Sequence, residues 1–220
     1  MDNQILTPDQ IAFLERIGST SFLTERFYLT GGTPLAAFYL GHRFSEDLDF
    51  FSEQEVDIAA LNAFWQDAKA DLGILKIDAQ QSYNRNLFFF HLASGVLKAE
   101  FTYFPFPRIE TGPVRYGIQT ESMLDIAVNK LFTIYQRTKA RDYIDLYCLC
   151  RKQGYEIADL IAKARMKFDY HIDPLQLVTQ FYKAKDAPDM PRMIIDVPAA
   201  EWQGFYLEEI KKLQSQILEK

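Results

Sequence analysis

Residues 28–51 read YLTGGTPLAAFYLGHRFSEDLDFF and contain the pattern that decides the predicted fold. Two glycines, Gly31 and Gly32, follow a short apolar run, and glycine allows a tight turn that brings backbone N–H groups close to a ligand. Thr33 is a candidate helix N-cap, and the proline after it suits a first helical position, so we expect a short helix over residues 34–40. The positive end of that helix would face the glycine turn, which predicts a phosphate site.

Two aspartates, Asp47 and Asp49, follow this helix in the pattern Asp-Leu-Asp. Strand alternation places both carboxylates on one face, about 7 Å apart along the chain. Carboxylates that converge beside a phosphate-binding turn supply the oxygen ligands that Mg²⁺ prefers. A glycine turn or an acidic strand is common when it occurs alone, whereas their combination within one stretch favours a functional site.

The composition is that of an ordinary globular protein. The chain has 220 residues, of which 48% are hydrophobic and 15% aromatic, enough for the core of one large domain or two small ones. No leader is predicted at the start, and no stretch approaches the roughly 18 apolar residues of a membrane span, so we expect a cytoplasmic protein with no membrane partner. Cys148 and Cys150 lie two positions apart on a predicted helix and point in different directions, which predicts core thiols rather than a disulfide or a zinc site.

The charge balance limits the nucleic-acid partners that the chain could have. A formal net charge of −6 argues against tight nonspecific binding over the whole surface, but it is compatible with a local basic patch. Basic residues cluster late in the chain, at Arg137, Lys139 and Arg141, at Arg151 and Lys152, at Lys163, Arg165 and Lys167, and at Lys211 and Lys212. Each cluster taken singly is also typical of a solvated helix face.

The first half of the chain predicts a mixture of helices and strands. Apolar spacing and turn residues indicate helices over residues 7–17 and 57–72, and strands over residues 27–29, 48–51, 75–78, 86–92 and 96–104. In the last of these strands, alternation places Lys98, Glu100 and Thr102 on one face. Glu100 is therefore a candidate third carboxylate, and a solvated strand face is the alternative interpretation.

The second half of the chain predicts helices. Pro105 ends the predicted sheet and Gly112 starts a new segment, so we expect domains over residues 1–111 and 112–220. The later part of the second domain is helical with interruptions, and no chemistry is predicted there.

Charged residues gather on the first helices of this second half. Lys130, Arg137 and Arg141 fall on nearly the same side if the helix that begins near residue 122 continues or resumes. Asp142 and Asp145 follow at spacing i and i+3 on the next predicted helix. This arrangement predicts a pocket wall, and a salt-bridge network between helices, with Arg141 and Asp145 at i and i+4, is the alternative.

The motif of the first half resembles a known superfamily. A Gly-Gly-Thr turn, a helix and then Asp-x-Asp on the next strand resemble the signature of the DNA polymerase beta-like nucleotidyltransferases. The detailed sequence of the motif, with His42 and Arg43 followed by residues 45–51, SEDLDFF, is similar to the AbiEii toxin-type branch of that superfamily. Glu100 departs from the aspartate that the superfamily usually carries on the neighbouring strand.

A second block of the chain carries the same resemblance. Residues 129–131, Arg137 and residues 141–146 resemble the second motif block of the toxin-type family, in which a lysine and a downstream aspartate belong to the active site. The lysine corresponds to Lys130, whereas Asp142 and Asp145 both stay candidates for the aspartate. The resemblance covers roughly residues 5–149.

The resemblance implies a fold, an activity and partners. The fold would be α+β, with a polymerase beta-like nucleotidyltransferase core, a small mixed sheet with flanking helices, followed by a helical C-terminal part. The activity would be Mg²⁺-dependent transfer of a nucleoside monophosphate from a nucleoside triphosphate to a hydroxyl acceptor. The family's role implies a toxin, with transfer RNA as an acceptor and a neighbouring antitoxin as a partner. A small-molecule nucleotidyltransferase and a catalytically silent binding module of the same fold are the alternatives.

Residues and resemblance together define the expected site. We expect a metal site at Asp47, Asp49 and Glu100. The expected catalytic residues are Asp47, Asp49, Glu100, Lys130, Asp142 and Asp145. The expected nucleotide-binding residues are Gly31, Gly32, Thr33, Arg43, Lys130 and Arg137. His42 and Arg43 are close enough in the sequence to orient a phosphate, but a packed imidazole and a salt bridge are equally good interpretations of them.

Overall fold

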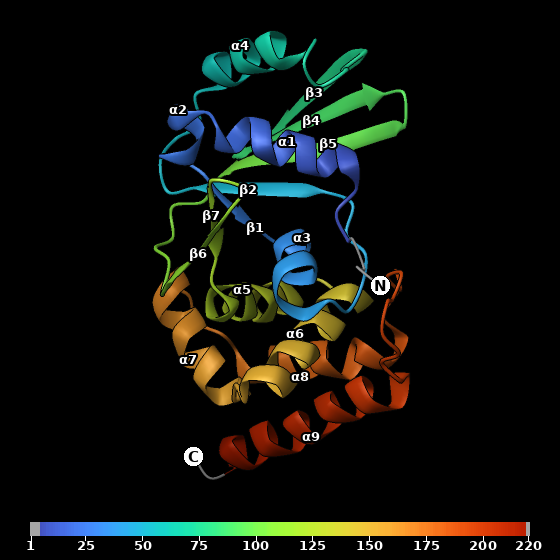
Figure 1. Ribbon diagram of the computed structural model, residues 1–220. Helices are drawn as coiled ribbons and strands as arrows, with labels where there is room; N and C mark the ends of the chain where they lie inside the picture. Colours follow the sequence, from blue (N-terminus) through green and yellow to red (C-terminus); the bar gives the residue numbers. More distant parts are fainter. Residues whose placement is uncertain (1–4, 219–220) are drawn as a thin grey trace. The chain divides into compact units, whose positions relative to one another are not determined.

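The computed structural model describes residues 5–218, which form two compact units (Figure 1). Unit 1 comprises residues 5–39 and Phe44–Ser122, and unit 2 comprises Leu40–Arg43 and residues 123–218. The short segment Leu40–Arg43 therefore belongs to unit 2, although unit 1 surrounds it in the sequence. No helix in the described part of the chain is long and apolar enough to cross a membrane.

Unit 1 is built on a mixed sheet of seven described strands. In spatial order these are β3 (Lys76–Ser82), β4 (Arg85–Leu92), β5 (Gly95–Tyr103), β2 (Leu48–Ser52), β1 (Tyr28–Thr30), β7 (Ile118–Glu121) and β6 (Thr111–Arg115). The pairs β1–β7 and β2–β5 are parallel, and the remaining neighbours are antiparallel. The expected mixed sheet with flanking helices, and with it the α+β class, is confirmed.

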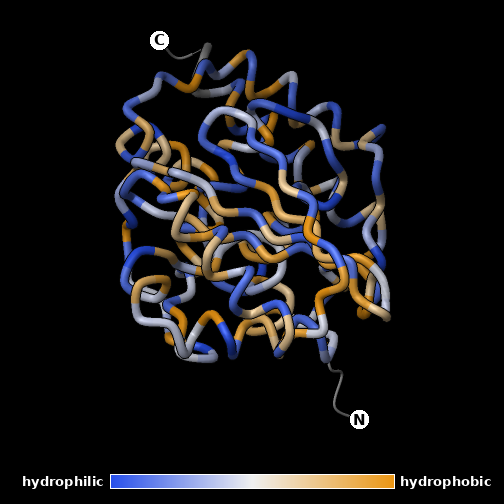
Figure 2. Tube along the Cα trace, turned by 90° about the horizontal axis from the view of Figure 1, so that it is seen from above, coloured by the Kyte–Doolittle hydropathy of each residue, from blue (hydrophilic) through white to orange (hydrophobic). Residues whose placement is uncertain are grey.

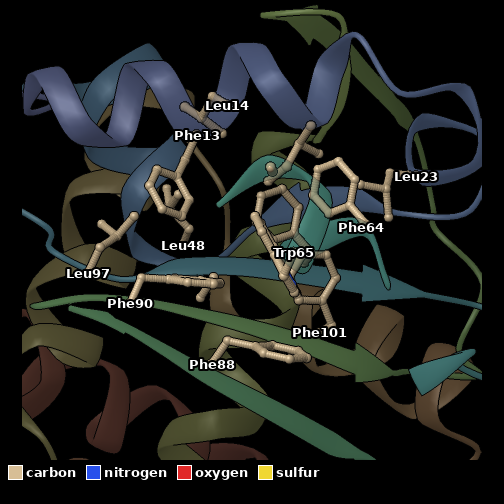
Figure 3. Close-up of a cluster of buried hydrophobic side chains, with 14 of the residues drawn as sticks. Phe13, Leu14, Leu23, Leu48, Phe64, Trp65, Phe88, Phe90, Leu97 and Phe101 are labelled. Atoms are coloured by element: carbon tan, nitrogen blue, oxygen red, sulfur yellow. The ribbon is translucent and has the colours of Figure 1, made fainter. Parts of the chain in front are cut away.

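An aromatic core packs against one face of this sheet. Helices α1 (Pro8–Gly18), α2 (Ser21–Thr24) and α4 (Ile58–Ala68) contribute to unit 1. Trp65 of α4 lies at the centre of the core, with ring centroids 4.5 Å from Phe90 and 5.9 Å from Phe101 (Figure 3). Phe88 and Phe90 are buried in this core, whereas the alternate residues Leu87 and Phe89 point to the other face and are partly exposed. The opposite face of the sheet is thus less deeply buried along β4.

The sheet extends further along the chain than the sequence predicts. Residues 111–121 form the hairpin β6–β7 and do not start the helical part, because β7 pairs in parallel with β1 through Leu29 and Thr120. Pro113 is tolerated in β6, since β6 is an edge strand of the sheet. The compact units accordingly divide between Ser122 and Met123, later than the boundary expected at residues 111 and 112.

Unit 2 is helical throughout its regular structure. Its elements are α5 (Met123–Gln136), α6 (Ala140–Gln153), α7 (Ile157–Phe168), α8 (Pro174–Tyr182), the 3-10 helix η2 (Lys183–Asp186) and α9 (Ala199–Leu218). Cys148 and Cys150 lie on α6 as free thiols, the second of them buried. Hydrophobic and hydrophilic residues are interspersed along the trace of the chain (Figure 2).

The aromatic core generates a first prediction. We expect Trp65→Ala to lower the free energy of unfolding by about 3–5 kcal/mol, because truncating a buried tryptophan leaves a cavity among several rings. The matched control is Leu75→Ala, an exposed apolar residue that should change stability by no more than about 0.5 kcal/mol. Urea unfolding followed by far-UV circular dichroism measures both. A Trp65→Ala loss as small as that of the control would contradict the packing.

Candidate active site

The register of three strands brings two of the expected carboxylates together. Thr30 of β1 pairs with Asp49 of β2, and Asp49 pairs in turn with Glu100 of β5. Residues in register on neighbouring strands point to the same face of a sheet. Leu48 and Phe50, which flank Asp49, are fully buried on the core face. Asp49 and Glu100 therefore lie side by side on the opposite face, as strand alternation predicts.

The glycine turn lies directly against Asp49. Gly31 has φ +80°, a conformation that favours glycine, and a Cβ at this position would lie only 2.6 Å from Asp49 Oδ2. Gly31 is the N-cap of α3 (Gly32–Pro34), which continues as the π-helix η1 (Leu35–Leu40). The prediction that Thr33 is the cap of a helix over residues 34–40 is wrong, because the chain already turns into the helix at Gly32.

Thr33 has a different role from the one expected. Its side chain is buried, and its hydroxyl donates a hydrogen bond to the carbonyl oxygen of Asp47 and lies 2.9 Å from Ser45 Oγ. Gln10 of α1 holds the same loop by donating from Nε2 to the carbonyl oxygens of Ser45 and Glu46, each at 3.1 Å. The hydroxyl of Thr33 thus fixes the loop that leads to Asp47, and any contact of Thr33 with a phosphate would come from its backbone N–H.

Two cations already pair with the carboxylates of unit 1. Lys98 Nζ lies 2.8 Å from Asp47 Oδ2, and these side chains are 25% and 39% exposed. Arg85 binds both oxygens of Glu100, at 2.6 Å each, and Thr102 Oγ1 donates to Glu100 Oε1 at 2.9 Å. The Glu100 side chain is only 7% exposed, so the alternative of a solvated strand face is wrong.

The pairing of Glu100 decides its protonation state. Burial by itself would raise the pKa of Glu100, but the hydrogen bonds from Arg85 and Thr102 outweigh burial and the pKa is lowered. Glu100 is therefore held as a carboxylate, which suits a metal ligand or a charge neighbour and makes it a weak proton acceptor.

The carboxylates fit a hard cation in their chemistry. Asp47 and Asp49 offer oxygen ligands, and Gly31 leaves the space that the Asp49 carboxylate fills. Within residues 5–218, no group of three or more His, Cys, Asp or Glu side chains is already arranged to hold a metal ion. A cation site here would therefore rest on the two aspartates, with Glu100 joining only if it shares its oxygens with Arg85.

Unit 2 contains a separate buried ion network around Asp145 of α6. Asp145 is fully buried and accepts from Arg43 Nε at 2.7 Å, Arg43 Nη2 at 2.8 Å and Lys130 Nζ at 2.7 Å. His42 Nε2 lies 2.8 Å from Asp145 Oδ1. His42 and Arg43 are themselves buried, so the interpretation as a packed imidazole and a salt bridge describes them.

Asp142 joins the same network from the preceding turn of α6. It binds Lys130 Nζ at 2.7 Å and Arg137 Nη2 at 3.0 Å, and Arg137 stays about half exposed. Helix α5 ends at Gln136 and α6 begins at Ala140, so Lys130 and Arg137 meet at Asp142 across a break in the helix. Arg141 does not take part: the partners of Asp145 are Lys130, Arg43 and His42 rather than the arginine at i−4.

The cations of the network keep both aspartates ionised. Burial by itself would raise the pKa of Asp145, but Lys130, Arg43 and His42 hold it well below its usual range. Burial acts in the same direction on Asp142, where Lys130 and Arg137 outweigh it and the pKa is lowered.

Fold and motif together define the class of this protein. A mixed sheet that carries a glycine turn directly against Asp-x-Asp is the core of a DNA polymerase beta-like nucleotidyltransferase. The chain belongs to the family described as nucleotidyl transferase AbiEii toxin, type IV TA system, which matches residues 12–213. The family makes it a nucleotidyltransferase enzyme, and the sequence resemblance to this branch is confirmed.

The chain is also similar to a curated protein and, in its fold, to several solved structures. An uncharacterized protein of Aquifex aeolicus (strain VF5) is 29% identical over 209 residues, which span 94% of this chain and 97% of that protein. The fold is similar to that of JHP933 from Helicobacter pylori, with TM-score 0.59 and 22% identity over 100% of this chain and 97% of the other. A putative nucleotidyltransferase from H. pylori has TM-score 0.61 and 24% identity, covering 98% and 99%. MenT4, a nucleotidyltransferase toxin from Mycobacterium tuberculosis, has TM-score 0.50 and 15% identity, covering 93% and 82%.

Sequence reasoning missed the two cations of unit 1. Lys98 was placed on the face of Glu100 by alternation, but nothing in the local pattern pairs it with Asp47, which is 51 positions away. Arg85 is 15 positions from Glu100 and lies on the neighbouring strand. The signal that could have found Arg85 is the hairpin itself, since pairing β4 with β5 brings Arg85 next to Thr102.

The glycine turn generates a second prediction. We expect Gly31→Ala to cost about 1–3 kcal/mol of unfolding free energy, because φ +80° with ψ −150° is a conformation essentially restricted to glycine, and more because the Asp49 carboxylate must move. Gly73→Ala is the matched control, since Gly73 has φ +63° with open space around a new Cβ and reports the backbone cost alone. Thermal unfolding compares the two variants. Equal losses would show that Gly31 does not constrain Asp49.

The buried network generates a third prediction. We expect Asp145→Asn to lower the unfolding free energy by about 3–5 kcal/mol, because Lys130 and Arg43 lose a buried counter-charge. The control Asp189→Asn removes an exposed pair with Lys139 and should change stability little.

The same variant tests the pH dependence. Because the pKa of Asp145 is depressed in the folded protein, its contribution is complete above the unfolded value of about 3.9 and is lost as pH falls through the folded value. Urea unfolding in steps between about pH 6 and pH 3 should therefore show a shallower decline for Asp145→Asn than for the parent protein. Parallel declines would contradict the depressed pKa.

Proposed function

We propose that this protein is a Mg²⁺-dependent toxin that transfers a nucleoside monophosphate from a nucleoside triphosphate to a hydroxyl acceptor. The observation that carries the proposal is the contact between the Gly31 turn and the Asp49 carboxylate, with Glu100 in register beside it. This contact places backbone N–H donors and carboxylate ligands within one short stretch of unit 1. Such a combination suits a triphosphate and its metal ion.

Each residue of unit 1 has a proposed task. Asp47 and Asp49 hold Mg²⁺, which supplies neutralisation of the charge that develops on the phosphate oxygens. The backbone N–H groups of residues 31–33 bind the outer phosphates. Glu100 is the third carboxylate and acts as an ionised neighbour of Asp49, because its lowered pKa disfavours a role as proton acceptor.

The residues of unit 2 are proposed for the active site on the strength of the family resemblance. Arg137 is about half exposed at the rim of the Asp142 pair, so its guanidinium can also meet an anion. Lys130 is committed to Asp142 and Asp145, which suits a positioning role. The same holds for Arg43, whose guanidinium binds both oxygens of Asp145. Asp142 and Asp145 both remain candidates for the family's aspartate.

The acceptor and the partner are proposed from the family description. A type IV toxin–antitoxin role implies a neighbouring antitoxin that counteracts this protein. Transfer RNA is the hydroxyl acceptor that the sequence resemblance implies. An RNA acceptor would need a local basic surface, because the net charge of −6 opposes binding over the whole protein. A cytoplasmic site of action stays a prediction of the sequence.

The transfer reaction tests this proposal. The protein is incubated with each labelled nucleoside triphosphate, Mg²⁺ and total RNA, and labelled products are separated on a denaturing gel. We expect label in RNA, and we expect Asp49→Asn to reduce transfer by at least about 100-fold, because a charge that stabilises the transition state is lost. Thermal unfolding of the variant checks that the loss of transfer does not come from a loss of the folded structure.

A matched control separates the site from general surface charge. Asp78→Asn removes an exposed aspartate of β3 that pairs with Lys76 and His91, and it should leave transfer unchanged. Transfer by Asp49→Asn at the parent's rate would reject the proposed metal site. Label on a small hydroxyl compound and never on RNA would reject the toxin acceptor and keep the enzyme.

A further inference from the structure

Lys98 pairs with Asp47, one of the two aspartates that we propose as metal ligands. Its ammonium group lies 2.8 Å from Asp47 Oδ2, and β5 holds its backbone beside β2 through the pairs Leu48–Ala99 and Asp49–Glu100. The head group of Lys98 is therefore anchored next to the carboxylates and cannot move further than its own side chain allows.

The two cations of the site differ in how firmly they are held. The Arg85 side chain is 55% exposed, but it binds both oxygens of Glu100, which is almost completely buried, and such bidentate pairs are strong and directional. The pair of Lys98 with Asp47 rests on one nitrogen and one oxygen, and both side chains are partly exposed. Exposed pairs of this kind contribute little to stability. Lys98 is thus the cation that a ligand displaces, and Arg85 stays with Glu100.

Charge balance indicates where Lys98 goes when it is displaced. Asp47 pairs with Lys98 and Glu100 pairs with Arg85, while Asp49 lies in register beside Glu100. A divalent ion held by Asp47 would replace the charge that Lys98 supplies there and would leave the ammonium group of Lys98 beside a positively charged site. A polyphosphate that arrives with the ion brings the anionic oxygens that a lysine ammonium binds well.

From this geometry we propose that Lys98 is a phosphate-binding residue that exchanges partners, from Asp47 in the metal-free protein to the triphosphate of the metal-loaded protein. The inference rests on the proposed function, since it needs the metal at Asp47 and a triphosphate substrate. The inference adds that Lys98 weakens the binding of the metal ion when nucleotide is absent. When nucleotide is present, Lys98 strengthens the binding of the triphosphate. Metal and triphosphate would therefore bind with positive cooperativity.

The exchange predicts opposite effects on two ligands. Mg²⁺ alone and inorganic tripolyphosphate in saturating Mg²⁺ are titrated into the protein by isothermal calorimetry. We expect Lys98→Met to bind Mg²⁺ alone about five-fold more tightly, because the competing ammonium is gone. The same variant should bind tripolyphosphate about ten-fold more weakly, because a hydrogen bond to a charged group is lost. Lys98→Arg should restore part of the tripolyphosphate affinity.

Lys76→Met is the matched control. Lys76 of β3 forms a similar pair with Asp78, also at 2.8 Å, but belongs to another strand and another carboxylate. This control should leave both affinities unchanged. Thermal unfolding of Lys98→Met should match the parent, which keeps the binding data interpretable.

The outcomes separate the two proposals. The exchange would be overturned if Lys98→Met weakened the binding of both ligands or changed neither affinity. It would also be overturned if Lys76→Met changed the affinities as much as Lys98→Met does. In each case the proposed function would still be supported by the binding of both ligands to the parent protein. A parent protein that binds neither Mg²⁺ nor tripolyphosphate would overturn the proposed function and the exchange with it. Tighter Mg²⁺ and weaker tripolyphosphate in Lys98→Met alone would support the exchange.

Discussion

The contact between Gly31 and the Asp49 carboxylate is the constraint on which the rest of unit 1 depends. A side chain at Gly31 would overlap Asp49 Oδ2, so the turn and the carboxylate can share this space only because the turn has no Cβ. Antiparallel pairing of β1 with β2 brings the glycine turn close to Asp49. Parallel pairing of β2 with β5 places Glu100 on the same face of the sheet. The aromatic core on the other face holds these strands, and Trp65 is its centre.

The two charged clusters of the protein obey different electrostatic rules. Around Asp145 the partners His42 and Arg43 are buried and the Lys130 side chain is only 11% exposed, so desolvation is costly and the partners must compensate it. The pair of Asp47 with Lys98 is partly exposed, so water also solvates both charges. Replacing Lys98 by another partner therefore costs little free energy. The first arrangement suits a fixed scaffold, and the second suits a site that takes up a charged ligand.

Glu100 shows how one strand neighbour can change the chemistry of a carboxylate. The superfamily usually carries an aspartate at this position, and the longer glutamate side chain here is bound by Arg85 at both oxygens. Burial would favour the neutral acid, but the guanidinium and the Thr102 hydroxyl keep the pKa of Glu100 low. A glutamate that is ionised and clamped serves as a fixed negative charge and is poorly suited to accept a proton from an attacking hydroxyl group.

The sequence by itself determined the features that depend on neighbouring residues. The glycine turn, the alternation that buries Leu48 and exposes Asp49, and the Thr7-capped helix α1 all follow from local rules. It also placed Glu100 on the correct face of its strand. The two motif blocks were enough to indicate the family, because within each block the motif residues lie close together in the sequence.

Tertiary structure decided everything that joins distant residues. Arg43 and Asp145 are 102 positions apart, so no local pattern shows that the segment after the glycine turn belongs with α6. Hairpin β6–β7 was missed because a strand with Gly112 and Pro113 is acceptable only at a sheet edge, and an edge exists only once the sheet has formed. The pairing of Lys98 with Asp47 likewise depends on the register of β2 and β5, which long-range packing sets.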